Sequence, residues 1–197
     1  MKIIFIRHGE TNLKTGKLTM NGVRQIKMAL KYIKNEKIDA IYCSPRTRAL
    51  QTANILNQKL NLPLFIVKEI NERQLLTPSQ KLLYEQEFND NYLNYSFQTE
   101  KYETCRDFID RTFEGLKKII SLSQKDDTVI VAAHSSTLYA LNAFVNGIPK
   151  NNHINWLQCS NGAVIKFYLW FFSAKCILEK LPNNNKIITW KWMLLII

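Results

Sequence analysis

The first ten residues, MKIIFIRHGE, constrain the fold of this chain more than any other stretch. Residues 3–6 are consecutive, apolar, and β-branched or aromatic, which is typical of a strand buried on both faces of a parallel sheet. Arg7, His8 and Gly9 follow at once. Because ligands bind beyond the carboxyl ends of strands in open α/β sheets, a binding site is expected here. An Arg-His pair also occurs in plain solvated turns, so these residues alone leave both interpretations open.

Two further segments repeat this arrangement. Arg48 lies near the start of a helix that follows a second apolar strand, and His134 directly follows the apolar run TVIVAA. In a parallel sheet these strand ends share one edge, so Arg7, His8, Arg48 and His134 are expected to converge. A phosphomonoester is doubly charged near neutral pH and needs several converging cationic or N–H donors. The pattern therefore favours phosphate as the ligand.

The order of segments predicts one α/β domain over residues 1–197, a three-layer α/β/α sandwich around a mostly parallel central sheet. Residues 69–98 read as a loop followed by one or two helices outside the sheet. Ser44 is expected to cap the second helix, and Asn161-Gly162 to close a hairpin between 156–160 and 163–172. A last strand is expected over 187–195. The other strands are predicted over 38–43, 64–67 and 128–133, and the helices over 20–34, 44–60, 104–122 and 135–146.

Composition narrows the class of partner. Lys and Arg outnumber Asp and Glu by 27 to 16, which gives a net charge of +11. Such a field favours anions, and either a phosphorylated metabolite or a nucleic acid would satisfy it. The basic residues are scattered without a block of five or more, so a small phosphorylated metabolite is expected and nucleic acid is not.

The cysteines and the apolar runs exclude other classes. Four cysteines show no C-x-x-C spacing and do not cluster with histidine, so no zinc site is expected. The N-terminal apolar run is too short for a signal peptide, and the chain has no run of about 18 apolar residues that would span a membrane. Reduced thiols in the cytoplasm, with no membrane partner, are the expectation. The sequence makes no prediction of oligomeric state.

Four segments occur in the order found in one family. They are RHGET (7–11), LTMNG (18–22), SPRTRALQTA (44–53) and VIVAAHSS (129–136). Together they resemble the histidine phosphatase superfamily, the phosphoglycerate mutase-like proteins, over about residues 1–169, and leave 170–197 unassigned. The resemblance implies the phosphoglycerate mutase-like fold, and neither a cofactor nor a metal.

The resemblance also implies roles for individual residues. His8 matches the histidine that becomes phosphorylated, and His134 matches the one that stabilises charge on the transferring group. The proton donor lies shortly after the third strand in a pattern like L-x-E, which Glu72 matches and for which Glu69 is the rival. The implied substrate contacts are Arg7, Arg48, Glu10, Asn12 and Ser135.

Departures from the family pattern limit the functional prediction. The loop after RHGET is short, His-Ser-Ser replaces the frequent His-Gly-Gly, and Arg46 stands where the family usually has an apolar residue. The expected function is metal-independent hydrolysis of a phosphomonoester through phosphohistidine. The alternatives are phosphoglycerate mutase-type transfer, or a non-enzymatic module that binds a phospho-ligand or nucleic acid. The organic half of the substrate has no readable match.

Overall fold

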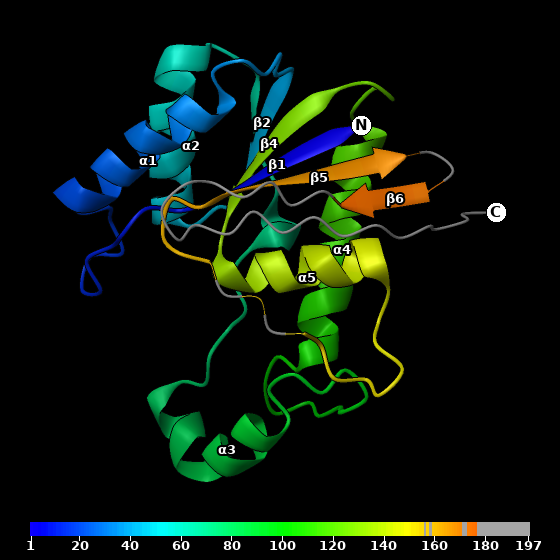
Figure 1. Cartoon of the computed structure of the whole chain (residues 1–197). Coiled ribbons are helices and arrows are strands. Elements are labelled where there is room, and N and C mark those ends of the chain that lie inside the picture. The colour runs from blue at the N-terminus through cyan, green and yellow to red at the C-terminus, as the bar shows by residue number, and fades with distance from the viewer. Residues whose placement is uncertain (156, 158, 171–172, 177–197) are drawn as a thin grey trace.

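The chain forms a six-stranded sheet between two layers of helices (Figure 1). A computed structural model describes residues 1–155, 157, 159–170 and 173–176. The sheet order is β3-β2-β4-β1-β5-β6, with β3, β2, β4 and β1 parallel and with β5 and β6 antiparallel to their neighbours. The predicted α/β fold with a mostly parallel sheet is confirmed. The strands are β1 (Lys2–Arg7), β2 (Ala40–Cys43), β3 (Leu64–Ile66), β4 (Thr128–Ala133), β5 (Val164–Trp170) and β6 (Ser173–Cys176).

The apolar residues of β1 divide between the two faces of the sheet, because successive side chains of a strand point in opposite directions. Ile4 and Ile6 pack with α1 and α2, and Ile3 and Phe5 pack with α4 and α5. All four are fully buried, which is why the run carries no polar residue. The helices of these layers are α1 (Met20–Ile33), α2 (Thr47–Leu60), α4 (Cys105–Ser121) and α5 (Ser135–Asn146).

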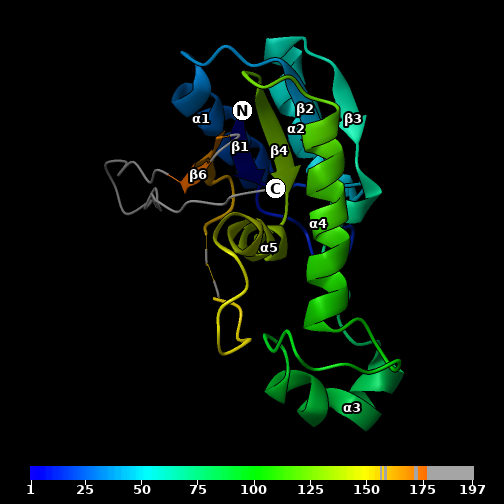
Figure 2. The same cartoon turned by 90° about the vertical axis from the view of Figure 1, so that its right-hand side faces the viewer.

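The segment between β3 and α4 extends away from the sheet (Figure 2). It contains the short 3₁₀ helix η1 (Lys68–Ile70) and helix α3 (Pro78–Asp90), as predicted for residues 69–98. Thr77 caps α3, and its side chain and that of Gln80 each accept a hydrogen bond from the other residue's backbone N–H.

Among the described residues, no helix combines the length and apolar character that crossing a bilayer requires.

Two local predictions are wrong. Ser44 does not cap α2, which begins at Thr47 after an N-cap at Arg46. The Asn161-Gly162 turn forms, but residues 157, 159 and 160 before it are not in a strand. Strand β5 instead pairs with β1 on one side and β6 on the other. The strand expected over 187–195 lies outside the described residues.

Two glycines from separate motifs pack back to back. A Cβ placed on Gly9 would lie 2.4 Å from the carbonyl oxygen of Gly22, and a Cβ on Gly22 would lie 2.1 Å from the carbonyl oxygen of Glu10. Both separations are far below van der Waals contact. The glycine of LTMNG therefore allows α1 to approach the turn that carries His8.

Gly22→Ala tests this packing through the sign of its effect. Alanine at an exposed position inside a helix normally stabilises by up to about 1 kcal/mol. Here we expect the free energy of unfolding to fall by about 1–3 kcal/mol, because the added methyl group overlaps backbone atoms. Urea denaturation measures the change, and an equal or more stable variant would contradict the packing.

Candidate active site

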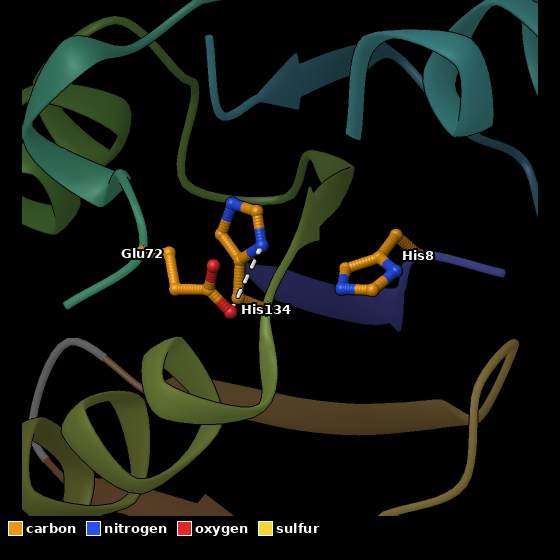
Figure 3. A group of neighbouring side chains, drawn as sticks. All are labelled: His8, Glu72 and His134. Carbon is orange, nitrogen blue, oxygen red and sulfur yellow. Dashed lines mark ion pairs between the residues drawn. The ribbon is translucent and has the colours of Figure 1, made fainter. Parts of the chain in front are cut away.

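Two histidines meet where β1 and β4 leave the sheet. The parallel register pairs Arg7 with Ala133, so His8 and His134 are the next residues of neighbouring strands. The backbone N–H of His8 donates to the Ala133 carbonyl at 3.0 Å, which continues the ladder one residue further. The two rings lie with centroids 5.3 Å apart at an interplanar angle of 62° (Figure 3).

His8 is held in one tautomer. Its Nδ1 lies 2.8 Å from the Gly9 carbonyl oxygen, which can only accept a hydrogen bond, so Nδ1 carries the proton. Nε2 therefore keeps its lone pair. Burial lowers the pKa of His8 to about 4, and the charges of Arg48 and Arg7 act in the same direction, against the Gly9 hydrogen bond. The imidazole is thus neutral and available as a nucleophile at neutral pH.

His134 is completely buried beside it. Its Nε2 shares a 2.7 Å hydrogen bond with the Ser44 hydroxyl. Within the described part of the chain its Nδ1 has no hydrogen-bond partner, and it lies 3.8 Å from a Glu72 carboxylate oxygen (Figure 3). Burial lowers the pKa of His134 to about 2, with further lowering by His8 and by the nearby arginines. A buried nitrogen without a partner is costly unless a ligand satisfies it.

Two arginines bring positive charge to the same place. Arg7 ends β1 and donates through Nη1 to the Cys159 carbonyl, while its buried Nε has no hydrogen-bond partner among the residues that the structure describes. Arg48, in the first turn of α2, forms an ion pair with Glu72. Arg7 Nε and His134 Nδ1, which lack hydrogen-bond partners in the described chain, are groups that an oxyanion can bind.

Hydrogen bonds of the residues before and after Glu72 hold its backbone in place. The side-chain oxygen of Asn71 accepts from the Glu72 backbone N–H at 2.8 Å. On the other side the Arg73 backbone N–H donates to Ser136 Oγ at 3.4 Å. The buried Arg73 guanidinium lies 4.2 Å from the Tyr92 ring centroid and donates to the Tyr92 carbonyl. Arg73 thereby anchors the segment that presents Glu72.

Glu69, the rival proton donor, lies elsewhere. Its carboxylate is 3.5 Å from Lys118 Nζ on α4, and its carbonyl accepts from Arg111. A Cβ on Gly115 of α4 would lie 2.9 Å from the Glu69 Cβ, so this residue packs on the helix. The geometry therefore joins Glu72, and not Glu69, to Arg48 and His134.

The other three predicted substrate contacts are Glu10, Asn12 and Ser135. The Glu10 carboxylate accepts from Thr19 Oγ1 at 2.6 Å and from Asn21 Nδ2 at 2.9 Å, which ties the first motif to the start of α1. The Asn12 side-chain oxygen accepts from two backbone N–H groups of its own loop, those of residues 14 and 15. Ser135 begins α5 next to His134. Ser135 is therefore adjacent to His134. The side chains of Glu10 and Asn12 are instead hydrogen-bonded to the start of α1 and to the loop that contains Asn12.

Three side-chain groups gather close enough to hold a metal ion. One donor atom each from His8, Glu72 and His134 lies within 4.8 Å of the others. Two histidines and a carboxylate are a set that divalent cations use. The guanidinium groups of Arg7 and Arg48 oppose a cation here and favour an anion.

Sequence reasoning missed the hydrogen-bonding roles of Ser44, Asn71 and Cys159. Ser44 is buried and its hydroxyl is hydrogen-bonded to His134. The Asn71 side-chain oxygen accepts from the Glu72 backbone N–H, and the Cys159 carbonyl accepts from Arg7. Ser44 is the first residue of the motif SPRTRALQTA and Asn71 directly precedes Glu72, and these positions are the available signal. The Cys159 contact uses the backbone, so the residue type carries no signal for it.

The chain belongs to the histidine phosphatase superfamily (branch 1), whose profile matches residues 3–171. It is also similar to a protein of Bacillus subtilis (strain 168) described as an uncharacterized phosphatase, PhoE. The two are 31% identical over 157 residues, which cover 74% of this chain and 77% of the relative. This membership supports phosphatase activity in general.

Solved structures share the fold at low sequence identity. Bacillus stearothermophilus YhfR superposes with a TM-score of 0.72 at 20% identity, over 86% of this chain and 91% of that one. A mycobacterial glucosyl-3-phosphoglycerate phosphatase with bound VO3 has a TM-score of 0.68 at 19% identity, over 85% and 92% of the chains. A putative alpha-ribazole-5'-P phosphatase of Escherichia coli has a TM-score of 0.68 at 23% identity, over 86% and 91%. The names of the last two describe phosphatases of small phosphorylated molecules.

The buried neutral histidines predict loss of stability in mild acid. The pKa values of His8 and His134 are lowered in the folded chain, so between pH 7 and 5 the unfolded chain binds protons that the folded chain does not. Each histidine should then lower the free energy of unfolding by roughly 2 kcal/mol over this interval.

Urea denaturation at pH 7 and pH 5, in a buffer without phosphate, measures the effect. His8→Gln and His134→Gln should each reduce the difference between the two pH values, and His153→Gln at an exposed position should not. An unchanged pH dependence in both buried-site variants would contradict the burial of neutral imidazoles.

Proposed function

We propose that this protein hydrolyses a small phosphomonoester through a phosphohistidine formed on His8, without a metal. The observation that carries the proposal is the free Nε2 lone pair of His8 beside two guanidinium groups. Nδ1 is committed to the Gly9 carbonyl, and Arg7 and Arg48 supply charge for the phosphate oxygens. Membership of the superfamily supports the same chemistry.

In the first step, Nε2 of His8 attacks phosphorus as the bond to the leaving oxygen breaks. The positive charge that develops on the imidazole is stabilised at Nδ1–H by the Gly9 carbonyl. Arg7, Arg48 and His134 stabilise the transferring phosphoryl oxygens. Glu72 gives its proton to the leaving oxygen, since an alkoxide is a poor leaving group.

Arg48 and Glu72 form an ion pair in this structure. A bound phosphate competes for Arg48 and places negative charge next to the carboxylate. Both changes favour the protonated acid that the first step needs. Substrate binding itself thereby prepares the proton donor.

In the second step, the Glu72 carboxylate takes a proton from water as the oxygen of that water attacks phosphorus. The bond between phosphorus and Nε2 breaks, the electron pair returns to His8, and inorganic phosphate leaves. About a third of the Glu72 side chain is exposed (33%), so water reaches the acid. This accessibility favours hydrolysis over transfer between two positions of a phosphoglycerate, which requires exclusion of water.

Replacement of His8 by alanine tests the covalent step. His8→Ala should lose the acid-labile, alkali-stable phosphate that rapid quenching traps on the wild-type chain, and turnover should fall by at least about 10³-fold. His153→Ala, at an exposed histidine, is the matched control and should retain both. Near-normal turnover by His8→Ala would refute the mechanism.

The dependence on the leaving group tests Glu72. Glu72→Gln should lose about 10²–10⁴-fold on an alkyl phosphate, and much less on nitrophenyl phosphate, whose phenolate departs without a proton. Glu69→Gln should lack this selectivity, because its carboxylate lies against Lys118. Equal loss on both substrates would mean that Glu72 holds the pocket together and donates no proton.

A further inference from the structure

Arg46 is an exposed cation near Arg48 and Glu72, and the proposed chemistry gives it no role. It stands at the N-cap of α2, two residues before Arg48. The ion pairs of the described residues include Arg48 with Glu72 and none of Arg46. A surface arginine without a carboxylate partner is ordinary, so its importance depends on where its side chain is held.

The Arg46 side chain is tethered to the segment that bears the proton donor. Its Nε donates to the Asn71 side-chain oxygen at 3.1 Å, and the same oxygen accepts from the Glu72 backbone N–H at 2.8 Å. The Arg46 backbone N–H donates to Ser44 Oγ at 3.3 Å, and that hydroxyl bonds to His134 at 2.7 Å. Arg46 is therefore linked through one residue each to Glu72 and to His134.

The charge of Arg46 reaches the buried groups. It lowers the pKa of Arg48, where only burial has a larger effect. It also lowers the pKa of His134, where burial, His8 and Arg48 have larger effects. On both groups it acts more strongly than the charge of Arg7, which is itself a pocket residue. The positive charge of Arg46 thus contributes to the electrostatic potential at Arg48 and His134.

The charges of the pocket are unbalanced for a simple phosphate ester. When Glu72 carries the proton, the guanidinium groups of Arg7, Arg48 and Arg46 hold three positive charges, whereas a phosphomonoester carries two negative charges. With Nε bound to Asn71, the two terminal nitrogens of Arg46 are left to bind a ligand, and a guanidinium pairs best with a carboxylate or a phosphate. Because Arg46 is exposed, while His8 and His134 are buried, its guanidinium suits a group on the organic half of the substrate.

We infer that Arg46 binds a second anionic group of the substrate, so that the preferred substrates are phosphomonoesters that also carry a carboxylate or another phosphate. This inference rests on the proposed function and adds a substrate class to it. Asn71 is then a positioning residue that fixes Arg46 and the Glu72 backbone together.

Three ligands with a common three-carbon frame separate the possibilities. 3-Phosphoglycerate carries a carboxylate where glycerol 3-phosphate carries an alcohol, and glycerol 1,3-bisphosphate carries a second phosphate. Calorimetric titration of each ligand into His8→Ala, at one ionic strength, measures affinity without hydrolysis. At least one of the anionic ligands should bind about tenfold more tightly than glycerol 3-phosphate, and which one does so identifies the second group.

Arg46→Gln in the same background should remove this preference. Lys59→Gln is the matched control, since it removes one exposed charge at the other end of α2, about 20 Å along the helix. The preference should survive in this control. The inference would be overturned if His8→Ala with Arg46 intact bound all three ligands equally well. It would also be overturned if the preference survived in Arg46→Gln.

The ratio of kcat/KM values for the same compounds on the chain with His8 intact provides a second readout, should His8→Ala fail to fold. Arg46→Gln should lower kcat/KM for the preferred anionic ester about tenfold more than for glycerol 3-phosphate. Absence of hydrolysis of any ester would count against the proposed function, while the binding ratios would still decide the role of Arg46.

Discussion

The site depends on the parallel pairing of β1 with β4. One register, with Arg7 opposite Ala133, sets His8 and His134 side by side, and the buried hydrophobic residues of both strands fix that register. A slip of one residue would turn every side chain of β1 to the opposite face, so the core that holds the sheet also holds the two imidazoles together. Packing and chemistry are therefore specified by the same residues.

The second constraint is electrostatic. The buried imidazoles are neutral, while Arg7, Arg48 and Arg46 remain cationic around them, and the carboxylate found among them is already paired with Arg48. Such a pocket favours an anion, and in the mechanism that we propose an anion bound to Arg48 releases Glu72 from its ion pair. Burial of the two histidines lowers stability in acid, and it keeps His8, which we propose as the nucleophile, unprotonated at neutral pH.

Much of this arrangement could be predicted from sequence because it depends on local patterns. The apolar runs define the strands, and strand ends in a parallel sheet locate Arg7, His8 and His134 near one another. The hydrogen bond of Ser44 to His134 could not be predicted, because a serine before a proline and a helix reads equally well as a cap. The hairpin at Asn161-Gly162 was predicted wrongly, because a turn signal does not say which strand its neighbour will pair with, and β5 pairs with β1. The side chain of Asn12 satisfies its own loop, which residue type alone does not reveal.

The central claim is that one oxyanion pocket unites side chains from three strand ends. A crystal structure with vanadate bound tests it most directly. The account predicts vanadium bonded to Nε2 of His8, with its oxygens on Arg7, Arg48 and His134 and with Arg48 released from Glu72. Vanadate bound elsewhere, or Arg48 still paired with Glu72 and away from the oxyanion, would contradict it.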